Sequence, residues 1–315
     1  MELDIPPGLI FVRDLASHGI DDRGLRRAAE RGTAVRLRRG VYFNGPWKSL
    51  TAEERYRLRC EAVARATEEL PLLSHQSAAA ILGLPSLDSW MSDVHITIEP
   101  AAGGRSRNGV RRHAGVVPAA SRIEVDGMLV TNVPRTVIDL ATTASFRSAV
   151  AAADFAIRAR APLTSRDELW AEFTGMRPFS NMRRAQRVLE FATELSDSPG
   201  ESLSRVVMHE LGFPEPELQA HFTNRSGGDI YTDFYWPEHS VVGEFDGRAK
   251  YEREQYLGGF TPEEKLWKEK LREDDVRRHV RRFVRWGWKE AMNPMELRAL
   301  LDDAGLPRLR IRLLT

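Results

Sequence analysis

The 315-residue chain lacks several features that would mark particular classes of protein. Its single cysteine, Cys60, cannot form an internal disulfide, which excludes a disulfide-stabilised secreted scaffold and favours a reducing compartment. No apolar run approaches the about 20 residues of a transmembrane helix, and the first residues lack the basic and apolar regions of an export signal. We therefore expect a cytoplasmic protein without a membrane partner.

Neither sign of charge prevails, since 46 Lys and Arg residues face 45 Asp and Glu residues, for a formal net charge of +1. Any attraction to nucleic acid must therefore come from local patches. Hydrophobic residues make up 42% of the chain and charged residues 29%, which is ordinary globular composition and excludes a disordered chain. The length predicts two or three domains of about 100–200 residues each.

Arginine gathers in three stretches of the chain. Its planar guanidinium group suits bidentate contacts to phosphates and bases, so these stretches favour nucleic-acid binding over the alternative, an ordinary solvated surface. The first stretch holds seven arginines and three acids between Asp21 and Gly40. The three clusters are Arg23, Arg26, Arg27, Arg31, Arg36, Arg38 and Arg39; then Arg105, Arg107, Arg111 and Arg112; then Arg277, Arg278, Arg281, Arg282 and Arg285.

The amino-terminal segment has the pattern of a helix-turn-helix followed by a wing. Apolar spacing predicts a helix over 11–18, and Asp21 or Asp22 can cap a second helix over 23–30. Alternating apolar and basic residues over 34–43 predict a two-stranded wing. Such modules insert a short helix into the major groove; the alternative is a helical cap on the next domain. The predicted DNA-binding residues are Arg23, Arg26, Arg27, Arg36, Arg38 and Arg39.

Residues 49–175 alternate between helical and strand-like segments, which predicts a mixed α/β domain. Capping boxes at Thr51-Ala-Glu-Glu54 and Ser165-Arg-Asp-Glu168 each open a helix. Cys60 is interpreted as core filler. Three histidines, His75, His95 and His113, are too scattered along the sequence to predict a metal site. The remaining expected elements are helices over 74–83 and 133–161 and strands over 94–99, 110–113 and 123–130.

Residues 5–175 contain a series of short motifs in a fixed order, which are Gly19, Leu25, Arg38-Arg-Gly-Val-Tyr42, Ser74-His-Gln-Ser-Ala-Ala79, Gly83-Leu84, Val94-His-Ile-Thr97 and Arg135-Thr-Val-Ile-Asp-Leu140. In this order the motifs resemble the AbiE-type antitoxin family of actinobacteria. The resemblance implies a winged-helix DNA-binding domain followed by a mixed α/β domain, and a role as a transcriptional repressor and antagonist of a nucleotidyltransferase-like toxin.

Two acidic residues of the last third are predicted to face each other across a hairpin. The segments 229–236 and 241–246 read as strands joined by four residues, and pairing Trp236 with Val241 places Asp233 opposite Glu244. Their Cβ atoms would then lie about 5 Å apart, with Asp246 on the same face. Facing carboxylates repel unless a cation neutralises them or one acid is protonated, and oxygen ligands of this type favour Mg²⁺ or Mn²⁺. A slipped register is the alternative.

Glu201 admits two interpretations. Ser198-Pro-Gly-Glu201 is a capping box with proline at the first helical position, and Glu201 also precedes Arg205 by four residues. Either structural role accounts for it alone. The functional interpretation is that the helix brings Glu201 to the carboxylate face of the hairpin.

Residues 198–295 contain a second series of motifs, which are Glu201, Gly212-Phe-Pro-Glu-Pro-Glu-Leu-Gln219, Asp233-Phe-Tyr-Trp-Pro237, Glu244-Phe-Asp-Gly247 and Glu269-Lys-Leu-Arg-Glu-Asp-Asp275. This series is similar to the very-short-patch-repair-like and DUF559 branch of the PD-(D/E)XK nucleases. It implies an αβββαβ restriction-endonuclease-like fold and metal ligation by Asp233, Glu244, Asp246 and Glu201. Asp246 replaces the usual motif lysine. Lys250, Lys268 or Lys270 could act in its place, and the alternative for each is a solvated surface lysine. Gln219 and Arg272 would support the site.

The sequence thus predicts a mixed α/β protein and two functional hypotheses. The first is a DNA-binding protein whose carboxy-terminal domain hydrolyses phosphodiester bonds with Mg²⁺; the second is a non-enzymatic antitoxin and autorepressor with an inactive nuclease fold. The expected divisions are a winged helix (1–48), an α/β domain (49–175), a helical connector (176–197) and a nuclease-fold domain (198–315).

Overall fold

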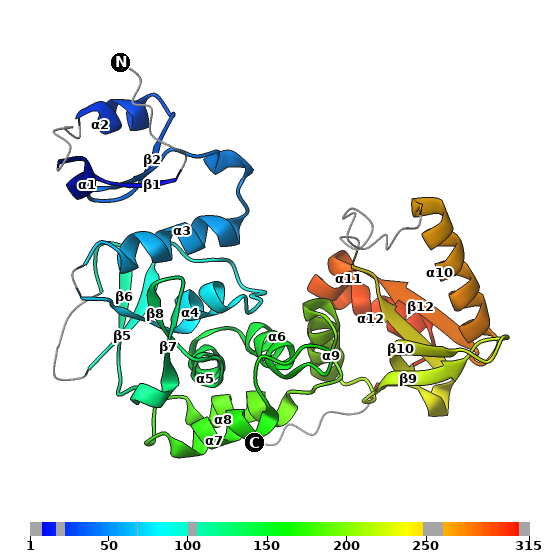
Figure 1. Ribbon diagram of the computed structural model, residues 1–315. Coiled ribbons are helices and arrows are strands. Elements are labelled where there is room, and N and C mark those ends of the chain that lie inside the picture. The colour runs from blue at the N-terminus through cyan, green and yellow to red at the C-terminus, as the bar shows by residue number, and fades with distance from the viewer. Residues whose placement is uncertain (1–7, 17–22, 68, 100–105, 248–260, 309–315) are drawn as a thin grey trace. The chain divides into compact units, whose positions relative to one another are not determined.

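The computed structural model describes residues 8–16, 23–67, 69–99, 106–247 and 261–308 (Figure 1). Helices and several small sheets are mixed along the chain, which confirms the expected fold class. The chain divides into two compact units, residues 1–145 with 164–187, and residues 146–163 with 188–315. The finer division expected from the sequence stays a prediction. None of the described helices is long and apolar enough to cross a membrane.

The amino-terminal module is a three-stranded antiparallel sheet with two short helices (Figure 1). The expected helix over 23–30 and the expected wing are confirmed. Phe11, expected in the first helix, instead ends a strand, where it pairs with Val41 and is buried. The predicted caps Asp21 and Asp22 lie outside the described residues. The elements are β1 (Leu9–Phe11), α1 (Val12–Ala16), α2 (Arg23–Glu30), β2 (Val35–Arg38) and β3 (Val41–Phe43).

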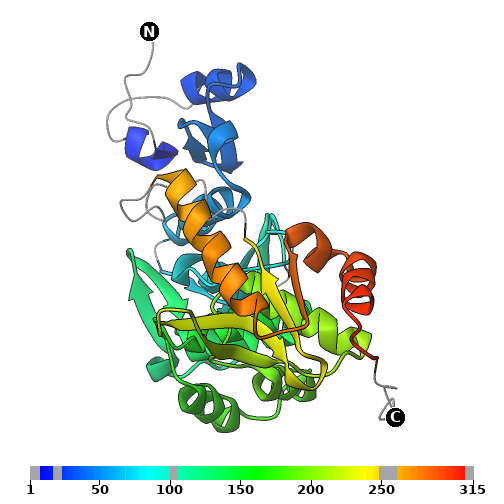
Figure 2. The ribbon, with the colours of Figure 1, turned by 90° about the vertical axis from the view of Figure 1, so that its right-hand side faces the viewer.

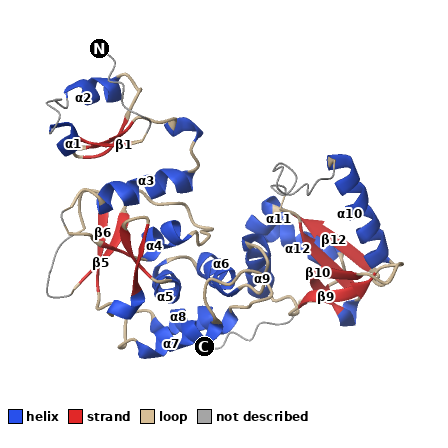
Figure 3. Ribbon diagram, in the orientation of Figure 1, coloured by secondary structure: helices blue, strands red, loops and turns tan. Residues whose placement is uncertain are grey.

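The rest of the first unit is built around a five-stranded sheet with strand order β6-β5-β4-β8-β7, and helices cover it (Figure 3). Antiparallel and parallel pairs both occur, since β5 runs parallel to β6 but antiparallel to β4. The elements are α3 (Ala52–Ala64), β4 (Leu72–Leu73), α4 (His75–Leu82), β5 (Val94–Ile98), β6 (Val110–Ala114), β7 (Arg122–Val125), β8 (Met128–Thr131), α5 (Val133–Thr143) and α7 (Arg166–Gly175).

Local sequence signals account for most ends of these elements. The predicted capping boxes of α3 and α7 are both present. Cys60 is fully buried in the core between α3 and the sheet, as expected, and burial raises the pKa of its thiol to about 12. The strand expected over 123–130 is instead the hairpin β7–β8, because Asp126 and Gly127 both adopt positive φ and turn the chain.

The second unit contains a four-stranded sheet with strand order β12-β11-β10-β9. The order α9-β9-β10-β11-α10-β12 along the chain is the αβββαβ order expected from the sequence. The elements are α6 (Phe146–Ile157), α9 (Pro199–Leu211), β9 (Glu217–Thr223), β10 (Asp229–Trp236), β11 (Val241–Phe245), α10 (Pro262–Arg277), β12 (Arg282–Trp286), α11 (Trp288–Met292) and α12 (Pro294–Asp303); α8 (Met182–Phe191) falls in the expected connector.

Both faces of this sheet are covered by helices. Helix α10 lies along one face (Figure 2), where Val276 packs against Val242 and Phe283. Helix α9 packs on the other face, where the indole N–H of Trp286 donates to Ser204 at 2.8 Å. A Cβ built on Gly200 would lie 2.0 Å from the Phe245 ring, so only glycine allows α9 to approach β11 this closely.

Candidate functional site

Helix α2 presents an arginine-rich face to solvent. Leu25 is buried, with 3% of its surface exposed, and anchors the helix to Ile10 and Tyr42. Arg26 and Arg27 are exposed, as is Arg23 one turn earlier. The helix therefore has the division expected of a groove-binding helix, with an apolar anchor on one side and guanidinium groups on the other.

The wing formed by β2 and β3 carries three further predicted DNA-binding arginines, and they differ in exposure. Arg36 and Arg39 are exposed. Arg38 is half-buried, and its buried Nη1 finds no hydrogen-bond partner among the described residues. Burial also lowers the pKa of its guanidinium group. Arg36 and Arg39 are consequently the wing side chains most accessible to a phosphate backbone.

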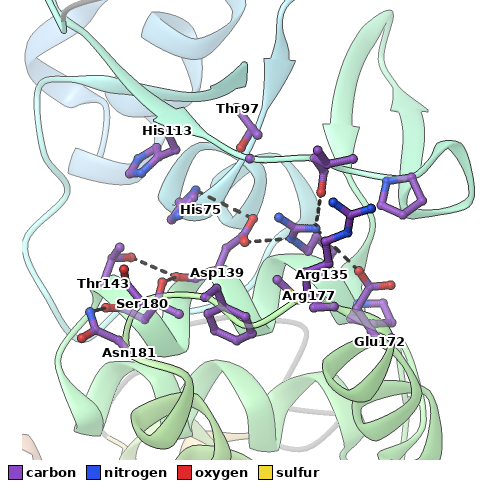
Figure 4. A pocket seen from close by; sticks show the side chains of 18 of the residues that line it. His75, Thr97, His113, Arg135, Asp139, Thr143, Glu172, Arg177, Ser180 and Asn181 are labelled. Atoms are coloured by element: carbon purple, nitrogen blue, oxygen red, sulfur yellow. Dashed lines mark hydrogen bonds and ion pairs between the residues drawn. The ribbon is translucent and has the colours of Figure 1, made fainter. Parts of the chain in front are cut away.

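The first unit also contains a cavity of about 1510 Å³. It is lined by residues of α4, β5, β6, α5 and α7 and by the segment that follows α7 (Figure 4). Charged and polar side chains of both signs project into it, among them His75, His113, Arg135, Asp139 and Glu172. A hollow with several convergent polar groups has the general form of a ligand-binding site.

Arg135 and Asp139 form a buried ion pair at the base of this cavity. They lie one turn apart on α5, with Arg135 Nε donating to Asp139 Oδ1 at 2.9 Å. Arg135 also donates to the Val116 carbonyl at 3.3 Å and lies 3.9 Å from Glu172. The second carboxylate oxygen of Asp139 lies 3.7 Å from His75 Nδ1 (Figure 4). The pair thus links α5 to the imidazole at the start of α4.

Three histidines meet beside this ion pair, one from each of α4, β5 and β6. One ligand atom each of His75, His95 and His113 lies within 4.8 Å of the others. The rings of His75 and His113 stack at 3.6 Å between centroids, and Nε2 of His113 lies 3.2 Å from Nδ1 of His95. Nε2 of His95 is buried and has no hydrogen-bond partner in the described part of the chain. We call these residues the histidine cluster.

Burial in the protein keeps the histidine cluster uncharged. It lowers the pKa of His95 to about 3 and lowers the pKa values of His75 and His113 as well, because an imidazolium ion loses hydration when it is buried. Neutral imidazoles keep a nitrogen lone pair at neutral pH, and such a lone pair can bind a metal ion.

Sequence spacing did not reveal this cluster. The three histidines are 20 and 18 residues apart, and none belongs to a metal-binding motif. The parallel pairing of β5 with β6, which places Thr97 opposite His113, and the attachment of α4 to the end of β4 bring them together.

In the second unit, the β10–β11 hairpin has the predicted register. Trp236 pairs with Val241, Tyr235 with Val242 and Phe234 with Gly243. If the same register extends by one residue, Asp233 lies opposite Glu244. Asp233 is half-buried, and its Oδ2 accepts a hydrogen bond from the Phe245 backbone N–H at 2.8 Å. Glu244 is buried.

Two guanidinium groups neutralise Glu244. Arg272 Nη2, from α10, lies 2.6 Å from both carboxylate oxygens, and Arg285 Nη2, from β12, lies 3.0 Å from Oε2. Both arginines also bind Glu269 at 2.8 Å, and Arg285 lies 3.4 Å from Glu273. Although burial alone would lower the pKa of Arg272, its bonds to Glu269 and Glu244 raise it, so the group stays charged.

The other predicted ligands have separate roles in this arrangement. Glu201 accepts hydrogen bonds from the Asp197 N–H at 2.9 Å and the Ser198 hydroxyl at 2.7 Å, at the start of α9. Asp246 donates its backbone N–H to Trp286, and Gln219 lies in β9 with a positive φ of 51°. Lys250 lies outside the described residues. Among the described side chains, these four carboxylates do not form a group of three possible metal ligands.

Comparison with known proteins gives three kinds of similarity. The proteins MT2308 and Rv2248 of Mycobacterium tuberculosis are each 29% identical to the chain over 171 residues, which cover 54% of the chain and 60% of each relative. The chain therefore matches less than two thirds of their length. The crystal structure of the RV2827C protein of the same organism aligns with 63% of the chain and 75% of its own, at 19% identity and a TM-score of 0.41. Residues 7–44 match the model of a family described as transcriptional regulator, AbiEi antitoxin.

Proposed function

We propose that this protein is a DNA-binding transcriptional regulator of the antitoxin type, which binds DNA upstream of its own gene through the amino-terminal module. The observation that carries the proposal is the exposed arginine face of α2, with Arg23, Arg26 and Arg27, in a segment that matches an AbiEi antitoxin family model. The family match also supports a toxin protein as the partner, and the sequence resemblance points to one of the nucleotidyltransferase type.

Binding of arginine side chains to DNA phosphates makes the affinity depend on the salt concentration. Arginines that contact phosphates displace counterions from the duplex, so the logarithm of the affinity falls linearly with the logarithm of the salt concentration. The wing arginines Arg36 and Arg39 are exposed and would add phosphate contacts next to the groove. Sequence preference then depends on the residues of α2 that reach base edges.

Fluorescence anisotropy with a labelled duplex from upstream of the gene tests the proposal. The full chain should bind this duplex at least about 1,000-fold more tightly than a duplex of the same composition in shuffled order. The affinity for both should fall as salt is raised from about 50 to 200 mM. Equal affinity for the two duplexes would contradict a regulator that recognises its own promoter.

Metal-dependent cleavage of DNA by the second unit is the second candidate function. The observation that favours it is the register of β10 and β11, since its continuation by one residue would pair Asp233 with Glu244 on one face. Because Arg272 and Arg285 neutralise Glu244, these arginines would have to release it before a cation could bind.

Supercoiled plasmid incubated with the full chain and Mg²⁺ or Mn²⁺ tests the cleavage hypothesis. If the hypothesis holds, Asp233→Asn lowers nicking by at least about 100-fold, the scale on which loss of one electrostatic catalytic group acts. Glu238→Gln, an exposed acid of the same hairpin, is the control and should cleave like the wild type. Equal nicking by the wild type and Asp233→Asn would remove this function for the second unit.

A further inference from the structure

We propose that His75, His95 and His113 form a binding site for one divalent transition-metal ion of the zinc class. Three side chains with one ligand atom each within 4.8 Å of the others are the number that zinc enzymes commonly use. Imidazole nitrogen is a preferred ligand of Zn²⁺, Co²⁺, Ni²⁺ and Cu²⁺, whereas Mg²⁺ and Ca²⁺ prefer oxygen. The site is distinct from the DNA-binding module and from the carboxylates of the second unit.

The spacing of two of the rings already suits a shared ion. Two nitrogens bound to a tetrahedral zinc at about 2.0–2.1 Å lie about 3.3–3.4 Å apart. Nε2 of His113 and Nδ1 of His95 lie 3.2 Å apart. An ion between them would replace the single proton that now joins the two nitrogens.

The third ring has the outer partners that metal-binding histidines usually have. His75 Nδ1 lies 3.0 Å from the Ser74 hydroxyl and 3.7 Å from Asp139, and Asp139 is held by Arg135. The Ser74 hydroxyl is within hydrogen-bonding distance of Nδ1, and an outer partner on Nδ1 leaves Nε2 to bind the metal. His75 also has a φ of +52°, a left-handed conformation that non-glycine residues rarely adopt and that is common at functional sites.

The stacking of His75 on His113 means that one ring must reorient before all three histidines can bind one ion. At 3.6 Å between centroids and 16° between planes, His75 and His113 lie face to face, so their nitrogens do not yet point to one centre. Because His113 Nε2 and His95 Nδ1 already lie 3.2 Å apart, His75 is the ring that would have to turn for its free nitrogen to reach the same centre. Since His75 and His113 also line the cavity, the fourth position of a bound ion would face the cavity and accept a water or an anionic ligand.

Titration of the chelator-treated full chain with Co²⁺ tests this proposal, because tetrahedral Co²⁺ bound to nitrogen absorbs strongly in the visible region. We expect one Co²⁺ per chain, displaced by Zn²⁺ and not by Mg²⁺. His113→Gln and His95→Gln should each weaken binding by more than the about 10–100-fold that loss of an outer partner costs.

His221→Gln is the matched control, because His221 also contacts a carboxylate, Asp229 at 2.7 Å, but is exposed and lies in the second unit. It should bind Co²⁺ like the wild type. Circular dichroism checks that each variant is folded, and His113→Gln replaces a side chain that is only half-buried. Absence of a visible band in the wild type, or the same band in the wild type and His113→Gln, would overturn the proposal.

Discussion

Replacing Arg26 and Arg27 together with alanine is expected to weaken binding of the full chain to its promoter duplex by about 100-fold. Each arginine of a groove-binding helix contributes about 1–3 kcal/mol, and 1.4 kcal/mol is a tenfold change in affinity. Loss of two phosphate contacts would also reduce the slope of log affinity against log salt by about two. Fluorescence anisotropy at several salt concentrations measures both quantities.

The Arg26→Ala, Arg27→Ala double variant should remove charge from α2 without unfolding the helix. Arg26 and Arg27 are exposed, and Leu25, which anchors α2, is unchanged. Alanine has a higher helix propensity than arginine, so α2 should remain folded. Arg183→Ala with Arg187→Ala is the control, since it removes the same charge from two exposed positions of α8. If both double variants lose the same affinity, the effect is one of net charge and α2 is not the recognition element.

Replacing Asp154 with alanine is expected to lower the free energy of unfolding by about 3–5 kcal/mol. Asp154 on α6 is fully buried, and its carboxylate lies 3.0 and 3.2 Å from Arg205 Nη2 on α9. It also accepts the Thr193 backbone N–H at 2.7 Å. The variant leaves the guanidinium group of Arg205 buried without its counter-ion. Removing one partner of a buried ion pair lowers the free energy of unfolding more than replacing both partners with apolar residues.

Urea unfolding followed by tryptophan fluorescence measures this effect. Asp302→Ala is the control, because Asp302 pairs with Arg298 at 3.3 Å on the surface of the same unit and should change stability by at most about 1 kcal/mol. Asp154→Leu combined with Arg205→Met removes both charges and should recover most of the loss. A double variant no more stable than Asp154→Ala would show that packing, and not the unpaired charge, causes the destabilisation.

Much of the fold was predictable, because many of its signals act within a few residues. The capping boxes at Thr51 and Ser165 each join a side chain to a backbone N–H three residues away, and both begin helices as predicted. The register of β10 and β11 was predictable for the same reason, since a four-residue connection leaves few ways to pair the strands. Phe11 was misassigned because a strand of three residues has too little periodicity to recognise.

The partners of the functional residues were harder to predict. The charge of Glu244 and its position in the hairpin were evident in the sequence, and they led to the expectation of a cation. Arg272 and Arg285, which neutralise it in the structure, are 28 and 41 residues away. Facing carboxylates indicate that positive charge is required, but they do not indicate whether a metal ion or an arginine supplies it.

By itself, the amino-acid sequence determined the local elements of this protein, their order, and the arginine face of α2, because helix periodicity, capping and tight turns depend on neighbouring residues. Only the tertiary structure decided which distant side chains meet. The histidine cluster exists because β5 lies beside β6 and α4 starts at the end of β4. Such contacts depend on the packing of whole elements, which no spacing along the chain encodes.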